Sequence, residues 1–336
     1  MKKFKRIFAV FFCLLMAASV LSSCGKAVSS SEAGTPAAET EKPLKIVTTI
    51  FPEYDWVRQI LGERAKNVEL TMLLDNGVDL HSYQPTADDI IKISDCDLFV
   101  YVGGESDGWV EDALKEATNQ NMKVINLLDV LGEQVKEEEV VEGMEGEDEE
   151  EADEEEGPEY DEHVWMSVKN AGTLCNAIAD ALEEIDPANK EVYAANAKSY
   201  QEKLSALDAE YKSVVDNATR KTVLFGDRFP FRYLVDDYGL NYYAAFVGCS
   251  AETEASFETI SFLAQKVDEL KLPCVLTIEG AKHKIAETIV QNTAEKNQSI
   301  LTLDSMQGTT LKDVENGTTY LSVMENNFNV LKQALN

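Results

Sequence analysis

The 336-residue sequence is short of the side chains on which several common kinds of site depend. It has only three histidines, and none of its six cysteines has a partner at the Cys-x-x-Cys spacing of a thiolate zinc site. It also has no HExxH, GxSxG, P-loop or glycine-rich dinucleotide motif. The sequence therefore supports neither a zinc knuckle nor an enzyme of these common classes.

Positive charge is scarce as well. The chain carries 30 Lys and Arg against 61 Asp and Glu, which gives a formal net charge of -31 at pH 7. Nucleic acid and anionic lipid surfaces would repel such a protein, so we expect neither as a partner. A cation is the class of ligand that this charge favours.

Much of the negative charge lies in one run. Residues Glu137–Glu162 hold seventeen carboxylates without a Lys or Arg, and the run ends at His163, shortly before Trp165. Burying so many like charges would be costly, so residues 132–162 are predicted to form a solvated, mobile loop. The loop could be a solubilising spacer, or it could concentrate a divalent cation beside His163, whose imidazole is a common metal donor.

The N-terminus has the pattern of an export signal. Met1–Ser23 combine a basic start with an apolar stretch at 7–20 that is too short for a confident membrane span. Leu21-Ser22-Ser23-Cys24 resembles the bacterial lipobox, so Cys24 is expected to carry a lipid on the extracytoplasmic face of the cell membrane. Residues 24–43 are predicted to be a flexible tether, and no later stretch is long and apolar enough to cross a bilayer.

The rest of the chain alternates apolar, β-branched runs with helical spacing, which predicts an α/β fold of mainly parallel sheets flanked by helices. The expected strands are 44–50, 68–74, 97–102, 124–128, 222–225, 242–247, 274–278 and 300–303. Residues 188–218 have the periodicity of one long helix, about 45 Å in length. We therefore expect an N-terminal lobe (44–185), a backbone helix (186–219) and a C-terminal lobe (220–336).

Possible ligands follow several strands. His81 lies between an expected strand and an expected helix, while Asp227 and Asp304 come just after strands of the second lobe. Ligands of parallel sheets usually lie beyond the carboxyl ends of the strands. His81 and His163 from one lobe could therefore meet Asp227 and Asp304 from the other. The remaining histidine, His283, is expected on a solvated helix surface.

Three motifs together resemble the solute-binding lipoproteins of bacterial zinc and manganese ABC importers: Thr48–Pro52, Asp79–Pro85 and Asp161–Trp165. The resemblance implies a monomeric receptor that captures a metal between two lobes and delivers it to a membrane permease with its ATPase. It also implies that His81 and His163 are the first two ligands.

The sequence departs from the family's pattern at the third ligand. Counted back from the Tyr-Gly-Leu that ends at Leu240, that position falls on Arg228, which cannot bind a cation. The neighbouring Asp227 is therefore assigned as the third ligand, and Asp304 matches the fourth.

Zinc accepts mixed ligands whereas manganese favours more oxygens, so two carboxylates in place of a third histidine shift the choice toward manganese. The resemblance nevertheless favours zinc, with manganese or iron as the alternative, because zinc receptors of this family often carry a His-rich or acidic insertion at the position of the acidic loop. A metal-dependent hydrolase with activated water is a second class, and a scavenging or adhesion protein that uses only the acidic loop is a third. Outside the cytoplasm a disulfide is possible, and Cys249 with Cys274 is the expected pair because both lie near strand ends.

Overall fold

Parallel strands in both halves of the chain form the frame of the protein. The structure is a computed structural model that describes residues 42–146, 159–250, 254–280 and 282–336. Within it, Pro43–Asn336 form one unit. The expected signal peptide, Cys24 and the middle of the acidic run lie outside the described residues.

The first half contains a four-stranded sheet whose strands all run parallel, in the order β2-β1-β3-β4. The strands are β1 (Lys45–Thr48), β2 (Glu69–Met72), β3 (Leu98–Tyr101) and β4 (Lys123–Asn126). The helices are α1 (Phe51–Leu61), α2 (Ala87–Ser94), α3 (Val110–Lys115), α4 (Leu127–Leu131) and α5 (Val168–Ile185). The apolar, almost wholly buried β3 is typical of a parallel strand covered on both faces.

The second half repeats the arrangement with two parallel pairs. They are β5 (Thr222–Leu224) with β6 (Asn241–Tyr243), and β7 (Cys274–Thr277) with β8 (Ser299–Thr302). A bridge between Phe225 and Leu276 connects the pairs. The helices are α7 (Arg232–Tyr238), α8 (Phe257–Leu270), α9 (Lys284–Asn292), α10 (Leu311–Glu315) and α11 (Tyr320–Leu335).

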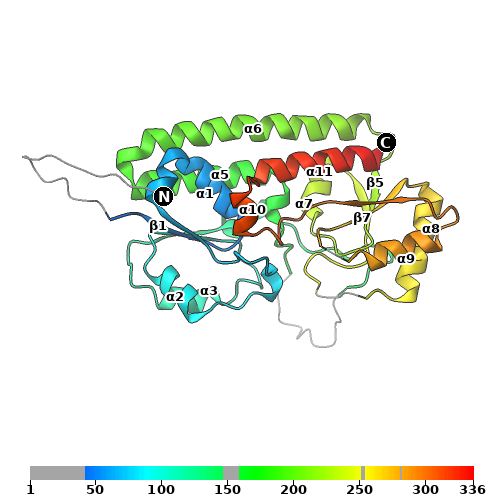
Figure 1. The fold of residues 1–336 in the computed structure, drawn as a ribbon, viewed down its shortest axis with the longest axis horizontal. Coiled ribbons are helices and arrows are strands. Elements are labelled where there is room, and N and C mark those ends of the chain that lie inside the picture. Colours follow the sequence, from blue (N-terminus) through cyan, green and yellow to red (C-terminus); the bar gives the residue numbers. More distant parts are fainter. Residues whose placement is uncertain (1–41, 147–158, 251–253, 281) are drawn as a thin grey trace, which may run out of the picture. The chain divides into compact units, whose positions relative to one another are not determined.

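The long helix is α6 (Lys190–Asn217), with 28 residues. It runs beside α5, α1 and α11 (Figure 1). Its buried side chains recur at steps of three and four residues: Tyr193, Ala197, Tyr200, Leu204, Leu207, Tyr211 and Val215. This apolar stripe explains why a mostly polar helix packs along the others. The α/β class with its long helix is confirmed, whereas the division into lobes at 185 and 220 stays a prediction.

Two expectations change in the structure. The strand expected at 242–247 ends at Tyr243, because Phe246 forms single bridges to Arg228 and Glu145 instead of continuing the ladder. The acidic run was expected to be solvated throughout, but Met144, Asp161 and Glu162 are buried. Its described ends are held by backbone hydrogen bonds, which offset the cost of burying polar groups.

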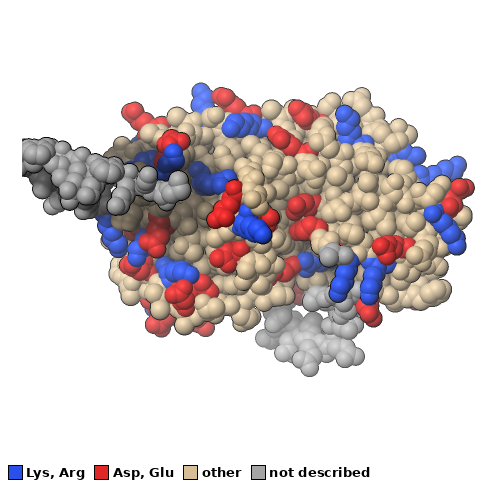
Figure 2. All heavy atoms as spheres, viewed as in Figure 1, with Lys and Arg blue, Asp and Glu red and all other residues tan. Residues whose placement is uncertain are grey.

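The surface charges are mixed where they can be seen. Figure 2 shows one face on which acidic and basic side chains are interspersed. Nine carboxylates of the acidic run fall within 147–156, outside the described residues. In the part of the chain that the structure covers, no helix combines the length and apolar character needed to cross a membrane.

Candidate metal centre

His81 lies in a short 3-10 turn, Leu80–Ser82, that follows β2. The Asp79 carboxylate caps this turn by accepting a hydrogen bond from the His81 backbone N–H at 3.1 Å. The ring Nδ1 lies 2.8 Å from Ser106 Oγ and 3.5 Å from a Glu162 carboxylate oxygen. Burial, together with nearby His163, lowers the pKa of His81 to about 3, so the imidazole is neutral and able to bind a cation.

His163 is wholly buried at the end of the acidic run. The Asp161 carboxylate accepts a hydrogen bond from the His163 backbone at 2.8 Å, and its same oxygen lies 3.0 Å from the ring Nδ1. Trp165 packs 5.2 Å from the ring, and its indole N–H donates to the Ser305 carbonyl at 2.8 Å. A carboxylate behind the imidazole fixes the tautomer and the ring orientation in metal sites.

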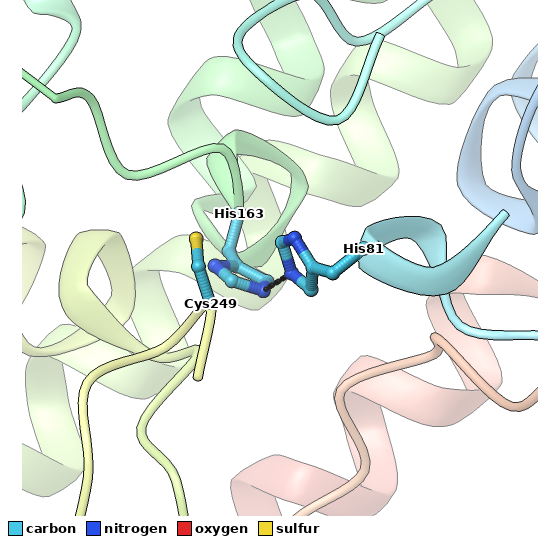
Figure 3. Close-up of side chains that lie close together, drawn as sticks. All are labelled: His81, His163 and Cys249. Carbon is cyan, nitrogen blue, oxygen red and sulfur yellow. Dashed lines mark hydrogen bonds between the residues drawn. The ribbon is translucent and has the colours of Figure 1, made fainter. Parts of the chain in front are cut away.

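The two imidazoles face each other. Their Nε2 atoms are 3.2 Å apart (Figure 3). With each Nδ1 directed at an oxygen atom, both Nε2 atoms are free to present lone pairs, which repel unless a proton or cation lies between them. Zinc binds imidazole at 2.0–2.1 Å, so tetrahedral geometry separates two such nitrogens by about 3.3 Å. The observed spacing suits one shared ion.

Cys249 supplies a third donor beside this pair (Figure 3). The donor atoms of His81, His163 and Cys249 all lie within 4.8 Å of one another. Gly248 brings the loop this close, because a Cβ there would lie 3.1 Å from His163 Nδ1 and 3.0 Å from the Phe229 carbonyl. Burial and the nearby Asp161 carboxylate raise the pKa of the Cys249 thiol, so a metal would have to displace its proton.

Asp227 and Asp304 do not join this group in the described residues. The Asp227 carboxylate accepts hydrogen bonds from Thr277 Oγ1 at 2.6 Å and from the Arg228 backbone at 3.0 Å. Asp304 accepts one from the Met306 backbone at 2.8 Å. Burial, then the Glu279 charge, raises the pKa of Asp304 to about 6.

The contacts of Arg228 help to explain why Asp227 and Asp304 lie outside the group of donors. Its guanidinium pairs with Asp79, the residue that caps the His81 turn, and lies 3.3 Å from the Gln307 side-chain oxygen. Arg228, Asp79 and Asp304 line one pocket. Arg228, which stands at the position of the family's third ligand, therefore balances the charge of Asp79 and links the two halves of the chain.

The expected disulfide is absent, since all four cysteines of the described chain are free. Cys274 is buried at the start of β7, whereas Cys249 lies beside the imidazoles. The sequence did contain a signal for Cys249, because Gly-Cys follows an expected strand of the second half, as Asp227 and Asp304 do. His283, expected in solvent, is half-buried with Nδ1 3.0 Å from Thr277 Oγ1.

The fold and the site together define a class of protein, the solute-binding metal receptors. The chain has parallel sheets in both halves, a long helix beside them and possible metal donors from both halves. The family model described as "Zinc-uptake complex component A periplasmic" (ZnuA) matches residues 46–334. The chain therefore belongs to this family, which is that of an uptake-complex component and not of an enzyme.

Individual relatives agree with this assignment. The chain is 33% identical over 299 residues to the zinc-binding lipoprotein AdcA of Streptococcus pneumoniae, covering 88% of this chain and 56% of AdcA. It thus spans about half the length of that relative. It is 30% identical to the high-affinity zinc uptake system protein ZnuA of Bacillus subtilis, covering 99% of this chain and 98% of the relative.

A solved structure confirms the fold. The crystal structure of the Zn(II)-bound ZnuA-like domain of Streptococcus pneumoniae AdcA superimposes with a TM-score of 0.67 at 29% identity. The match covers 87% of this chain and 99% of that domain.

Proposed function

We propose that this chain is the extracytoplasmic zinc-binding component of an ABC importer. It would capture Zn²⁺ on His81, His163 and Cys249 and deliver it to a membrane permease driven by an ATPase. The observation that carries the proposal is the pair of imidazole nitrogens facing each other at 3.2 Å. The names of the AdcA and ZnuA relatives, which are zinc-binding or zinc-uptake proteins, support zinc as the ion.

The donor set also favours zinc over manganese. Thiolate and imidazole are ligands that zinc accepts readily, whereas manganese prefers carboxylate, carbonyl and water oxygens. Three protein donors leave a fourth position, which water or a carboxylate could fill. The proposed site does not include Asp227 and Asp304, whose ligand roles are predictions from the sequence alone; the hydrogen bonds around Asp227 do not favour its release to a metal.

The remaining parts of the chain would serve delivery. We propose a lipid on Cys24 as a membrane anchor, a tether at 24–43, and lobes at 44–185 and 220–336 joined through 186–219. The relatives named as lipoproteins support the anchor. The carboxylates of the acidic run would raise the local concentration of divalent cations before one is captured.

Metal analysis of the purified protein tests the proposal. After exposure to equal amounts of zinc, manganese and iron, we expect one zinc per chain and little of the other two. His81→Ala should lose this zinc, whereas His283→Ala, which removes a histidine outside the group, should retain it. Binding of one manganese or one iron per chain, or full retention of zinc by His81→Ala, would overturn the proposed site.

A further inference from the structure

The first part of the acidic run is built into the fold next to the metal centre. Glu137 forms an antiparallel bridge with Tyr160, and the Glu138 N–H donates to the Glu159 carbonyl at 3.0 Å. The Asp161 N–H donates to the Lys136 carbonyl at 2.9 Å. Residues 136–138 therefore hold the chain that leads into His163.

The same part of the run contacts the second half of the chain. Glu139 lies 3.2 Å from the Arg232 guanidinium, and its carboxylate accepts a hydrogen bond from the Tyr242 hydroxyl at 3.3 Å. The Glu145 backbone N–H donates to the Ala245 carbonyl at 2.9 Å. Two backbone segments, one before His163 and one before Cys249, are thus linked through 136–145.

Within residues 136–145, Glu138 contacts the proposed metal ligand Cys249. Its Oε1 accepts a hydrogen bond from the Cys249 backbone N–H at 3.3 Å, and the carboxylate also interacts with the Cys249 side chain. Glu138 is half-buried, whereas its neighbour Glu139 is exposed. Both are carboxylates of the same run, but Glu138 contacts Cys249 of the proposed site, whereas Glu139 contacts Tyr242 and Arg232.

We propose that Glu138 is a positioning residue that holds the Cys249 sulfur against the two imidazoles. The start of the acidic run is then a structural part of the metal centre, in addition to any attraction of cations by its charge. This inference rests on the proposed site of His81, His163 and Cys249. Partners that orient metal ligands typically change metal affinity by about 10–100-fold.

A comparison of Glu138→Ala with Glu139→Ala separates positioning from charge, because each variant removes one carboxylate from the run. We expect Glu138→Ala to lower zinc affinity about tenfold and to weaken the ultraviolet cadmium–thiolate charge-transfer band of the Cd²⁺-loaded protein. Glu139→Ala should leave both unchanged. Glu138→Gln keeps an acceptor for the Cys249 N–H and should restore most of the band.

A double-mutant cycle tests whether Glu138 acts through Cys249. In the Cys249→Ser background, Glu138→Ala should cause no further loss of zinc affinity. If Glu138→Ala did not fold, Glu138→Asp would keep the charge, move the acceptor and still be expected to weaken the band.

Equal losses of zinc affinity in Glu138→Ala and Glu139→Ala would overturn the inference. So would an unchanged cadmium–thiolate band in Glu138→Ala or, should that variant not fold, in Glu138→Asp. An equally large loss of zinc affinity from Glu138→Ala in the Cys249→Ser background would overturn it as well. An unaltered protein that lacks the cadmium–thiolate band would instead contradict the proposed site itself. The two failures are therefore distinguishable.

Discussion

The histidine side and the cysteine side of the site are held in different ways. His163 is wholly buried, and Asp161 fixes both its backbone and its ring. Cys249 is only half-buried, on a loop that the structure describes up to Ser250 and again from residue 254. It is held through Gly248 against the His163 ring and through Glu138.

This difference separates two tasks. A donor that is already oriented loses little entropy when the metal binds, so the imidazole pair should supply most of the affinity. A thiolate changes the softness of the donor set, so Cys249 should contribute mainly to the choice of metal. Substitutions on the two sides should therefore differ in how far they change zinc affinity and metal preference.

The largest effect is expected for His163→Ala. The variant removes one of the two oriented imidazole donors, and the buried Asp161 carboxylate loses its ring partner while it keeps the backbone N–H of residue 163. Zinc affinity should therefore fall by about 1,000-fold or more, which is ~4 kcal/mol. Competition with a chelator of known affinity measures the change. A loss smaller than that of Cys249→Ser would reverse the assigned ranking of the two sides.

Cys249→Ser should have the second largest effect. A serine hydroxyl is a poorer zinc ligand than a thiolate, so we expect zinc affinity to fall by about 100-fold. Manganese affinity should change little, so the preference for zinc should narrow. Cys274→Ser serves as the control, because Cys274 is a free thiol in β7 outside the group. Unchanged metal preference in Cys249→Ser would show that the imidazoles alone set it.

The pH dependence should also distinguish the two sides. His81, with its pKa lowered to about 3, stays neutral as the pH falls from 7.5 to 5, so it adds nothing to the dependence. The Cys249 thiol, whose pKa burial raises, keeps its proton until metal arrives and then releases it. Zinc affinity should therefore fall about tenfold per pH unit from this proton alone.

Measuring zinc affinity at several pH values in the unaltered protein and in Cys249→Ser isolates that proton. The slope should be shallower in Cys249→Ser by about one proton per zinc. Equal slopes would mean that the thiol is not displaced by the metal, and the cysteine side would then not be a ligand.

The sequence predicted that His81 and His163 would lie close together, as they do in the structure, but it did not predict that Cys249 would lie beside them. His81 and His163 lie in local motifs, with Asp79 and Asp161 two residues before them as caps or ring partners. The spacing of residues within each motif therefore predicts much of the local geometry around the two histidines. Strand and helix positions were also local, because burial patterns repeat along each element.

Cys249 depends on contacts that no local pattern reveals. It reaches the histidines because Gly248 packs on a ring 85 residues earlier in the chain, and Glu138 bonds its backbone across 111 residues. The pairing of Arg228 with Asp79 spans 149 residues. Because these partners lie far along the chain, the sequence alone showed neither that Arg228 pairs with Asp79 nor that Cys249 lies beside the histidines.

The smallest effects are expected on the carboxylates of the second half. Asp227→Asn should change zinc affinity by less than about threefold, because Asp227 already accepts hydrogen bonds from Thr277 and the Arg228 backbone. Asp304→Asn should behave alike, since Asp304 shares its pocket with the cationic Arg228. The same chelator competition measures both. A loss of about 100-fold for Asp304→Asn would make it the fourth ligand, and the second half would then contribute an oxygen as well as a sulfur.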